Sequence, residues 1–308
     1  MFEKKLISIV IPAHNEELVI DELAKQLQKA MGQMADYSFE VVVVENGSTD
    51  STFEKLLAVR ERDKRFKILQ MSRTFFCEGG ITAGLHFIKG EAAVIMTADL
   101  QCPPHLIPEF IKKWEAGYEN IYGVVTKRHG ISFTRRLNSR LFYWLINKMS
   151  ANLFPPNVSD FRLVDKKVYK AINQMQERNR FMRGMFAWAG FKSIGIPHER
   201  PERFAGQSKA YFFATLGLAL KGIFMYSYLP LKLSTYLGIL VSISSFLFLI
   251  YTAINGFTSG TMVSIITFMF GVLFLILGII GEYIALILDE AKQRPNFIVK
   301  RKVGFDDE

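Results

Sequence analysis

Charged residues are missing from positions 233–281 of this 308-residue chain, although Asp, Glu, Lys and Arg make up 22% of the whole sequence. Cysteine is scarce too. Cys77 and Cys102 are too few for a disulfide framework and lack neighbours spaced as zinc ligands, which indicates a reducing, cytosolic setting. The 22 glycines and 10 prolines follow no repeat and 50% of the residues are hydrophobic, so collagen and disorder are excluded.

Two common nucleotide-binding patterns are absent as well. The sequence contains neither the G-x-x-x-x-G-K-[ST] loop that cradles phosphates nor the G-x-G-x-x-G fingerprint of dinucleotide-binding folds. It also lacks an RNA-binding motif, so no nucleic acid is expected as a partner.

Charge is distributed unevenly along the chain. The net charge of +9 divides into −4 for residues 1–120, +14 for residues 121–232 and −1 for residues 282–308. A basic middle segment therefore directly precedes the uncharged stretch. This pattern argues against a uniformly basic protein and against a wholly soluble one.

The uncharged stretch is too long for one membrane crossing. It divides at a turn-forming sequence, residues 255–260, into apolar halves at 233–254 and 261–288, each long enough for the ~20 residues that cross a bilayer. We therefore expect a hairpin of two transmembrane helices at residues 231–290. Lys and Arg flank both ends and are absent from the turn, so the positive-inside rule places the first domain and both termini in the cytoplasm. The alternative is a buried helical hairpin in a soluble protein.

The segments on either side of the hairpin differ in character. Residues 209–230 are rich in Tyr and Phe, which belong at the level of lipid headgroups, so we expect an amphipathic helix in the membrane interface. A helix packed against the soluble domain is the alternative. Residues 291–308 are expected to form a cytosolic C-terminal tail.

The first 120 residues alternate between strand-like and helix-like segments. The strand-like segments are residues 6–11, 40–44, 66–71 and 92–96, and the helix-like segments are residues 17–34, 50–60, 80–88 and 104–116. Continuous apolar strands between helices are typical of a parallel sheet covered on both faces. The sequence therefore predicts an α/β domain with a mainly parallel sheet.

Three of these strands run into polar segments, residues 12–16, 45–50 and 97–101. Ligands of open α/β sheets bind beyond the carboxyl ends of the strands. The three segments could thus supply hydrogen-bond acceptors for a nucleobase and ribose, and an oxygen ligand for Mg²⁺ or Mn²⁺. Each segment alone could equally be a turn or a helix cap.

Five ordered segments carry a resemblance to a known family. SIVIPAHNEE (8–17), VVVVENGSTDST (41–52), TADLQCPP (97–104), SDFRLVDKKV (159–168) and RPERFAGQSKA (200–210) are similar to the successive motifs of family 2 glycosyltransferases. With the hairpin behind them, they resemble the polyprenyl-phosphate glycosyltransferase branch, which includes dolichol-phosphate mannose synthases and bacterial undecaprenyl-phosphate sugar transferases. The resemblance implies a Rossmann-like GT-A catalytic domain at residues 1–208, an NDP-sugar donor and a polyprenyl-phosphate acceptor.

The resemblance also implies roles for single residues. Those implied to bind the nucleotide sugar are Pro12, His14, Glu16, Glu45, Ser48, Asp99, Gln101, Arg203 and Lys209. Those implied to bind the acceptor phosphate are Arg128, Arg135 and Ser139. Asp99, with Gln101 nearby, matches the position that holds Mg²⁺ or Mn²⁺, and Asp160 matches the catalytic carboxylate at the reacting centre. Two alternatives stay open. Asp160 could form a structural ion pair with Arg162 instead of acting in catalysis, and the arginines assigned to the acceptor phosphate could belong to a basic surface that attracts anionic lipid.

Several positions depart from the family pattern, most of them near the donor. Glu45-Asn46 replaces an Asp pair, and Thr97 replaces the first Asp of Asp-x-Asp, which leaves Asp99 as the sole carboxylate of that motif. Val125 stands where an Arg is common, and Phe76-Cys77 where Gly-Lys or Gly-His is common. The identities of the sugar and the base are therefore the least determined features.

The implied activity is an inverting transfer of a hexose from UDP-glucose or a related UDP-hexose to undecaprenyl phosphate, at the inner (plasma) membrane, for cell-envelope glycosylation. The rival interpretations are a membrane-tethered glycosyltransferase with a glycolipid or polysaccharide acceptor, and a degenerate, non-catalytic scaffold. Gly271, Gly278 and Gly281 permit close helix packing and hence a homo-oligomer, either dimer or tetramer.

Overall fold

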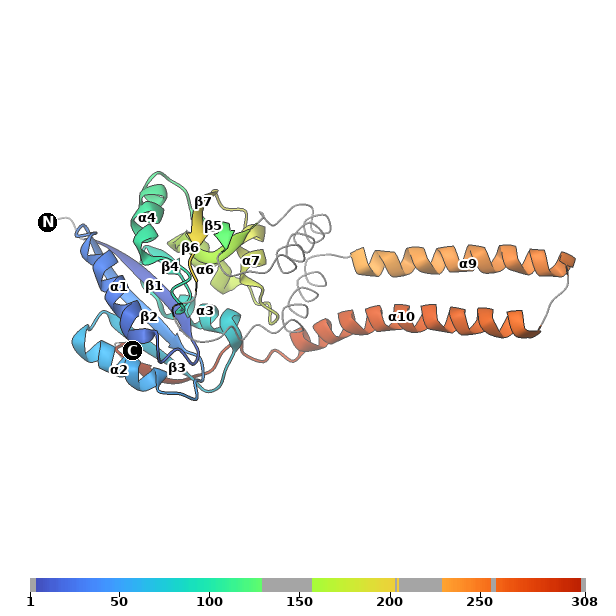
Figure 1. The fold of residues 1–308 in the computed structure, drawn as a ribbon, viewed down its shortest axis with the longest axis horizontal. Coiled ribbons are helices and arrows are strands. Elements are labelled where there is room, and N and C mark those ends of the chain that lie inside the picture. The colour runs from blue at the N-terminus through green and yellow to red at the C-terminus, as the bar shows by residue number, and fades with distance from the viewer. Residues whose placement is uncertain (1–3, 129–156, 203, 205–228, 256–258, 306–308) are drawn as a thin grey trace.

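The apolar runs near the start of the chain form the centre of a mainly parallel sheet. A computed structural model describes residues 4–128, 157–202, 204, 229–255 and 259–305 (Figure 1). Strands β1 (Lys5–Ala13), β2 (Tyr37–Glu45), β3 (Phe66–Met71) and β4 (Ala92–Ile95) run parallel to their neighbours among these four. Their side chains are buried on both faces, which explains the continuous apolar runs. The predicted α/β domain with a mainly parallel sheet is confirmed.

Four further strands complete the sheet on its two sides. Within the described ranges the order is β7-β5-β6-β4-β1-β2-β3-β8. On one side β6 (Val158–Asp165) is antiparallel to both β4 and β5 (Asn120–Arg128), and β7 (Ser193–Arg200) is parallel to β5. On the other side β8 (Val299–Val303) is antiparallel to β3. The sequence predicted only a tail at residues 291–308. β8 carries three consecutive basic residues, which give no apolar strand pattern and suit an exposed edge strand.

Helices cover both faces of the sheet. One face carries α1 (Ile20–Gly32), α2 (Thr52–Arg62), and α4 (Ile107–Glu115) after the short 3₁₀ turn η1 (Pro104–Leu106). The other carries α3 (Phe76–Phe87), α6 (Lys166–Gln174) and α7 (Met182–Trp188). In α3, a side chain at Gly84 would overlap Val10, so glycine lets this helix approach β1 closely.

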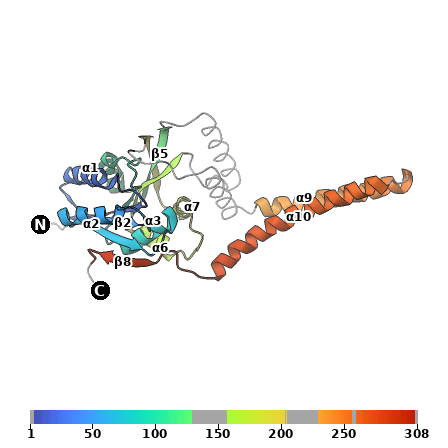
Figure 2. The same ribbon diagram turned by 60° about the horizontal axis from the view of Figure 1, so that its bottom comes forward.

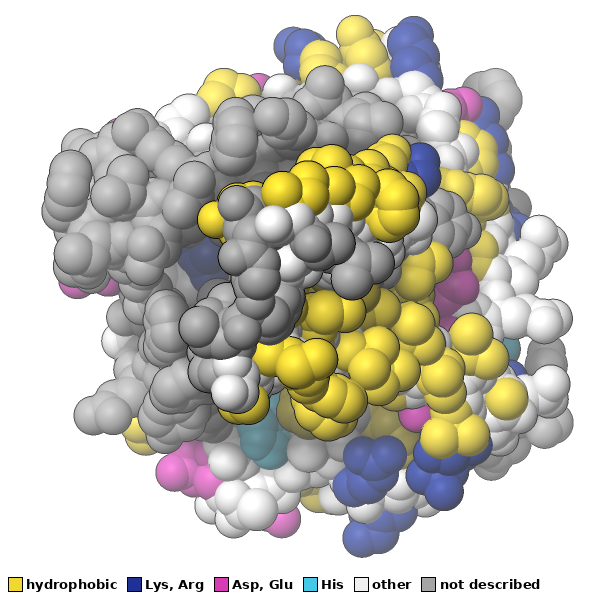
Figure 3. All heavy atoms as spheres, turned by 90° about the vertical axis from the view of Figure 1, so that its right-hand side faces the viewer, with side chains coloured by type: hydrophobic (Ala, Val, Ile, Leu, Met, Phe, Trp, Pro, Cys, Tyr) yellow, Lys and Arg dark blue, Asp and Glu magenta, His cyan; other side chains and the backbone are white. Residues whose placement is uncertain are grey.

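Two long apolar helices extend from this domain. α9 (Leu229–Asn255) and α10 (Ser259–Ala291) lie side by side in Figures 1 and 2. Their large apolar side chains face outward, with Phe246 63% and Phe274 67% exposed. Figure 3, viewed from the hairpin end, shows hydrophobic side chains gathered over the projecting helices. The segments Leu231–Thr252 and Ile265–Ala291 are long and apolar enough to cross a membrane, and their exposure contradicts the buried-hairpin alternative.

The C-terminal end of α10 contacts the α/β domain at the segment before α7. Oε1 of Glu290 accepts hydrogen bonds from the backbone N–H groups of Arg178 at 2.8 Å and Asn179 at 3.2 Å. Downstream, the side-chain amide of Asn296 donates to the Glu177 carbonyl at 3.0 Å. The hairpin is thus hydrogen-bonded to the domain at its exit. Nearly all of the expected interfacial segment, residues 209–230, lies outside the described residues.

Candidate active site

The predicted polar segments meet at one edge of the sheet. The carboxyl ends of β1, β2, β4 and β7 and the start of the antiparallel β6 all lie at this edge. Ile95 of β4 pairs with Arg162 of β6. Two residues further on, Thr97 lies level with Asp160 because paired antiparallel strands advance in opposite directions. The motifs that follow β1, β2 and β4 and the motifs at the start of β6 and the end of β7 therefore form one site.

The loops after β1 and β2 are hydrogen-bonded to each other. Nδ1 of His14 lies 3.0 Å from the Asn46 carbonyl oxygen, and the backbone N–H of Asn15 donates to Oγ of Ser48 at 3.0 Å. The buried Glu45 carboxylate accepts from the Ser48 backbone N–H at 2.5 Å. Glu45 and Ser48 therefore shape the turn at the place predicted for the nucleobase. Pro12 and Glu16 lie on the adjoining β1 segment, so five predicted donor residues come together here.

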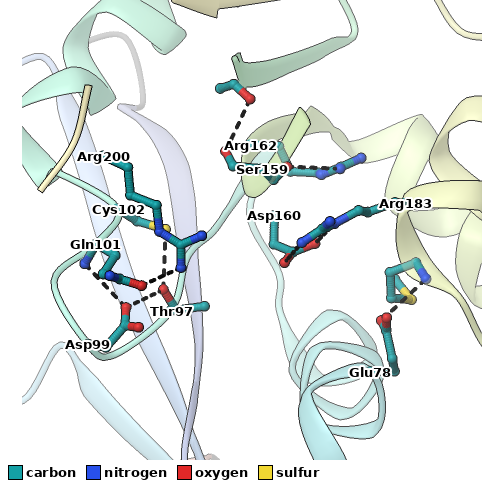
Figure 4. Close-up of polar contacts among 12 residues, drawn as sticks. Glu78, Thr97, Asp99, Gln101, Cys102, Ser159, Asp160, Arg162, Arg183 and Arg200 are labelled. Atoms are coloured by element: carbon teal, nitrogen blue, oxygen red, sulfur yellow. Dashed lines mark hydrogen bonds and ion pairs between the residues drawn. The ribbon is translucent and has the colours of Figure 1, made fainter. Parts of the chain in front are cut away.

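Asp99 presents a carboxylate oxygen with no hydrogen-bond donor in the part of the chain that the structure describes. Its other oxygen, Oδ1, accepts from the Thr97 hydroxyl at 2.7 Å and from the Gln101 backbone N–H at 3.2 Å (Figure 4). Leu100 between them has φ 60°, a strained conformation for a branched side chain. The described residues contain no group of three or more His, Cys, Asp or Glu side chains placed to hold a metal ion together. One oriented carboxylate fits Mg²⁺ or Mn²⁺ when diphosphate oxygens supply further ligands.

Gln101 is oriented by the end of β7. Its Oε1 accepts a hydrogen bond from Nη2 of Arg200, and its Nε2 lies 3.5 Å from the Pro201 carbonyl oxygen. The amide oxygen of Gln101 is thus directed to a guanidinium. Its proposed role toward a metal stays a prediction.

Asp160 is held by an arginine that the sequence analysis did not single out. Nε of Arg183 lies 2.6 Å from Oδ1 of Asp160, and Nη2 lies 2.5 Å from Oδ2 (Figure 4). This is the paired geometry in which a guanidinium fixes a carboxylate most firmly. The expected alternative partner, Arg162, instead stacks on the Phe186 ring at 4.3 Å. The alternative of an Asp160–Arg162 ion pair has the wrong partner: among the described residues, Asp160 is paired with Arg183.

Three guanidinium groups act on the charge of the Asp160 carboxylate, and of these Arg183 contacts it directly. Burial opposes its charge, but Arg183, with Arg162 and Arg200 behind it, outweighs burial and lowers the pKa of Asp160. Burial also lowers the pKa of Arg162 to about 10, which leaves it cationic at neutral pH. The three guanidinium groups outnumber the two nearby carboxylates, Asp160 and Glu78, which gives this part of the site a positive balance that suits a phosphate group.

Part of the predicted site lies outside the described residues. Arg135, Ser139, Arg203 and Lys209 belong to that part, and of Arg128 only the backbone, at the end of β5, is described. Two contributors were missed, Arg183 and Arg200. Arg200 opens the 200–210 motif, a signal that was available, whereas Arg183 stands in no motif and is placed only by the packing of α7.

Comparison with known proteins identifies the family. Residues 8–172 match the family model "Glycosyl transferase family 2". An uncharacterized glycosyltransferase of Bacillus subtilis (strain 168), YkcC, is 41% identical over 306 residues, covering 97% of this chain and 94% of that protein. A bactoprenol glucosyl transferase of Shigella phage SfV is 34% identical over 304 residues, covering 96% of this chain and 98% of that protein.

A solved structure is similar at lower identity. Glucosyl-3-phosphoglycerate synthase from Mycobacterium tuberculosis, in complex with Mn²⁺, uridine-diphosphate and phosphoglyceric acid, is 17% identical with a TM-score of 0.47, covering 71% of this chain and 76% of that one. The family match over residues 8–172 and the nearly full-length relatives show that this chain is a glycosyltransferase of family 2.

Proposed function

We propose that this glycosyltransferase moves a hexose from a UDP-sugar, UDP-glucose or a close relative, to a polyprenyl phosphate. The observation that carries the proposal is the placement of Asp99 and of the arginine-surrounded Asp160 at one edge of a sheet whose domain bears an exposed apolar hairpin. The relatives named bactoprenol glucosyl transferase support both the glucosyl group and the lipid acceptor.

The donor would bind over the loops after β1, β2 and β4. Pro12, His14, Glu16, Glu45 and Ser48 would surround the nucleoside, as their position at the sheet edge favours. Asp99, with Gln101 beside it, would hold Mg²⁺ or Mn²⁺, which neutralises charge on a leaving diphosphate when bound. Arg203 and Lys209 would approach the diphosphate from the segment after β7.

The acceptor would enter beside Asp160. A phosphate monoester has its second pKa near 6, so at pH 7 the lipid phosphate is mostly a dianion and can attack without losing a proton. Its oxygen would form a bond to the anomeric carbon while the bond from that carbon to the diphosphate oxygen breaks, and the nucleoside diphosphate would leave with the electron pair. The Asp160–Arg183 pair would orient the acceptor, with Arg128, Arg135 and Ser139 holding the same phosphate.

The hairpin would place this site at a membrane surface. Exposed apolar side chains on α9 and α10 suit a lipid environment, and Lys292 and Arg294 follow the hairpin directly. Because α10 leads back into strand β8 of the catalytic sheet, the two crossings return the chain to the side on which it started. We place the catalytic domain on the cytoplasmic side of the plasma membrane, with residues 209–230 in the interface.

The direct experiment uses the purified full chain in detergent. It is incubated with a panel of NDP-sugars, undecaprenyl phosphate and Mg²⁺ or Mn²⁺, and the lipid is analysed by mass spectrometry. We expect one hexose on the lipid monophosphate with UDP-glucose or another UDP-hexose. Absence of a glycolipid with every donor would refute the proposal, and transfer to a glycolipid acceptor alone would replace the acceptor class.

A further inference from the structure

Glu78 lies next to the Asp160–Arg183 pair but has no part in the mechanism above. It stands in the first turn of α3, and its Oε2 accepts a hydrogen bond from the backbone N–H of Met182 at 3.2 Å (Figure 4). Met182 is the first residue of α7, and the N-terminal end of that short helix has no side-chain cap of its own. Glu78 therefore supplies, from another helix, an acceptor for the start of the helix that carries Arg183.

The position of Glu78 is itself fixed from the sheet. The buried side chain of Asn46, at the end of β2, accepts from the Phe75 backbone N–H at 2.8 Å and donates to the Phe76 carbonyl at 2.6 Å. These bonds hold the first turn of α3, where Phe76 has φ 54°. A continuous set of contacts thus runs from Asn46 through the α3 start, Glu78 and the α7 start to Arg183.

Electrostatics couples Glu78 to the same charges. Burial, with the nearby Asp160 carboxylate second, raises the pKa of Glu78 to about 7, while Arg183 and Arg162 pull it down. Cys77 is its titratable neighbour on α3. Two carboxylates and two guanidinium groups therefore form one cluster, in which the protonation of Glu78 changes the balance around Asp160 near neutral pH.

We propose that Glu78 is a positioning residue of the transfer reaction, acting through Arg183 on Asp160; this inference rests on the function proposed above. Ionised Glu78 is the stronger acceptor for the Met182 backbone N–H at the start of α7. When Glu78 is protonated, this hydrogen bond weakens, Arg183 is held less firmly against Asp160, and the Asp160 carboxylate orients the acceptor less well. The transfer step therefore depends on the charge of a residue that touches neither substrate.

The test compares wild-type protein with Glu78→Gln across pH. Glutamine keeps the size and an oxygen that can accept from Met182, but it removes the charge. We expect the ratio of wild-type to variant kcat to be near 1 at about pH 6 and to rise to about tenfold at about pH 8, with a midpoint near 7 and an unchanged KM for the donor. The acceptor phosphate titrates equally in both proteins and cancels in the ratio. A ratio independent of pH would overturn the proposal.

Glu54→Gln is the matched control. Glu54 is the third residue of α2, as Glu78 is of α3, but its side chain is exposed on the surface. This variant should give a flat ratio near 1, and the same pH profile in both variants would contradict a role specific to Glu78. In an Arg183→Lys background, Glu78→Gln should have little further effect on kcat, whereas independent losses would show that Glu78 does not act through Arg183.

A second readout does not depend on activity. Because the folded-state pKa of Glu78 is raised from 4.5 to about 7, its contribution to stability is complete below about pH 4.5 and is lost as the pH rises through about 7. The melting temperature of wild-type minus that of Glu78→Gln should therefore fall over this range. If the difference in melting temperature did not change with pH, the role of Glu78 would be overturned. If the difference fell with pH but the protein transferred no sugar, only the proposed function would be refuted.

Discussion

The two sides of the site differ in the side chains that they present. On the side of β1, β2 and β4, loops present carboxylates, hydroxyls and amides that are hydrogen-bonded to backbone groups, as at Glu45, Ser48 and Asp99. On the side of β6, α7 and β7, guanidinium groups predominate: Arg183 pairs with Asp160, and Arg162 and Arg200 also lower the pKa of that carboxylate. The first arrangement suits a nucleoside and a metal, and the second suits a phosphate anion. Under the proposed function, we expect donor and acceptor to be bound by separable sets of residues.

Asp160→Asn should have the largest effect, because it removes the carboxylate that Arg183 holds beside the proposed acceptor position. We expect kcat to fall at least about 100-fold, since the acceptor loses its orienting group and Arg183 loses its partner. Steady-state transfer assays measure this effect. Asp21→Asn, which disrupts an exposed ion pair with Arg62 outside the site, is the control and should keep full activity. A loss of less than about tenfold, or ~1.4 kcal/mol of barrier, would remove Asp160 from the reaction.

Arg183→Lys should have the next largest effect. Lysine keeps the charge but cannot make the two parallel hydrogen bonds seen at 2.6 and 2.5 Å, so we expect kcat to fall about tenfold with an unchanged KM for the donor. Arg62→Lys, in the exposed pair with Asp21, is the matched control. If the donor KM rose as much as kcat fell, the arginine would belong to the donor side and the division between the two sides would be wrong.

Thr97→Asp tests the side formed by the loops after β1, β2 and β4. We expect a smaller effect than for Arg183→Lys, and an improvement in metal affinity instead of a loss of activity. The substitution restores a second carboxylate beside Asp99, so the Mg²⁺ concentration for half-maximal activity should fall by about threefold to tenfold. Thr97→Ser keeps the hydroxyl that donates to Asp99 and should leave the metal requirement as it is. A metal titration of transfer activity gives both values. An unchanged requirement in the aspartate variant would argue against a metal at Asp99.

Glu290→Gln should have the smallest effect, because Glu290 does not contact Asp160 and acts only on the segment before α7, the helix that carries Arg183. The change weakens two charge-assisted hydrogen bonds from the segment before α7, which should cost about 1 kcal/mol of stability and lower kcat less than Arg183→Lys does. Glu61→Gln, exposed near the end of α2 and outside the hairpin, serves as the control in thermal melting and transfer assays. Equal effects of the two variants would show that the contact does not support α7.

The two sides also differ in how far the sequence predicts them. The strands and helices of the first 120 residues were predictable from their apolar patterns. The position of His14, Ser48 and Asp99 at the sheet edge was predictable because each lies within one motif directly after an apolar strand. Arg183 was not, because it reaches Asp160 only through the packing of α7 against the sheet and stands in a segment without a motif. Strand β8 was missed for a related reason: its basic residues give no strand pattern, and pairing with β3 places it.

Donor affinity of the Asp160→Asn variant tests the separation of the two sides most directly. Titration calorimetry with UDP-glucose and Mg²⁺, on protein whose transfer activity has been lost, gives the dissociation constant for the donor alone. If donor and acceptor are bound by different residues, this constant should lie within about twofold of the wild-type value, under ~0.5 kcal/mol. A constant weakened by tenfold or more would contradict the division, because Asp160 would then be part of the donor site.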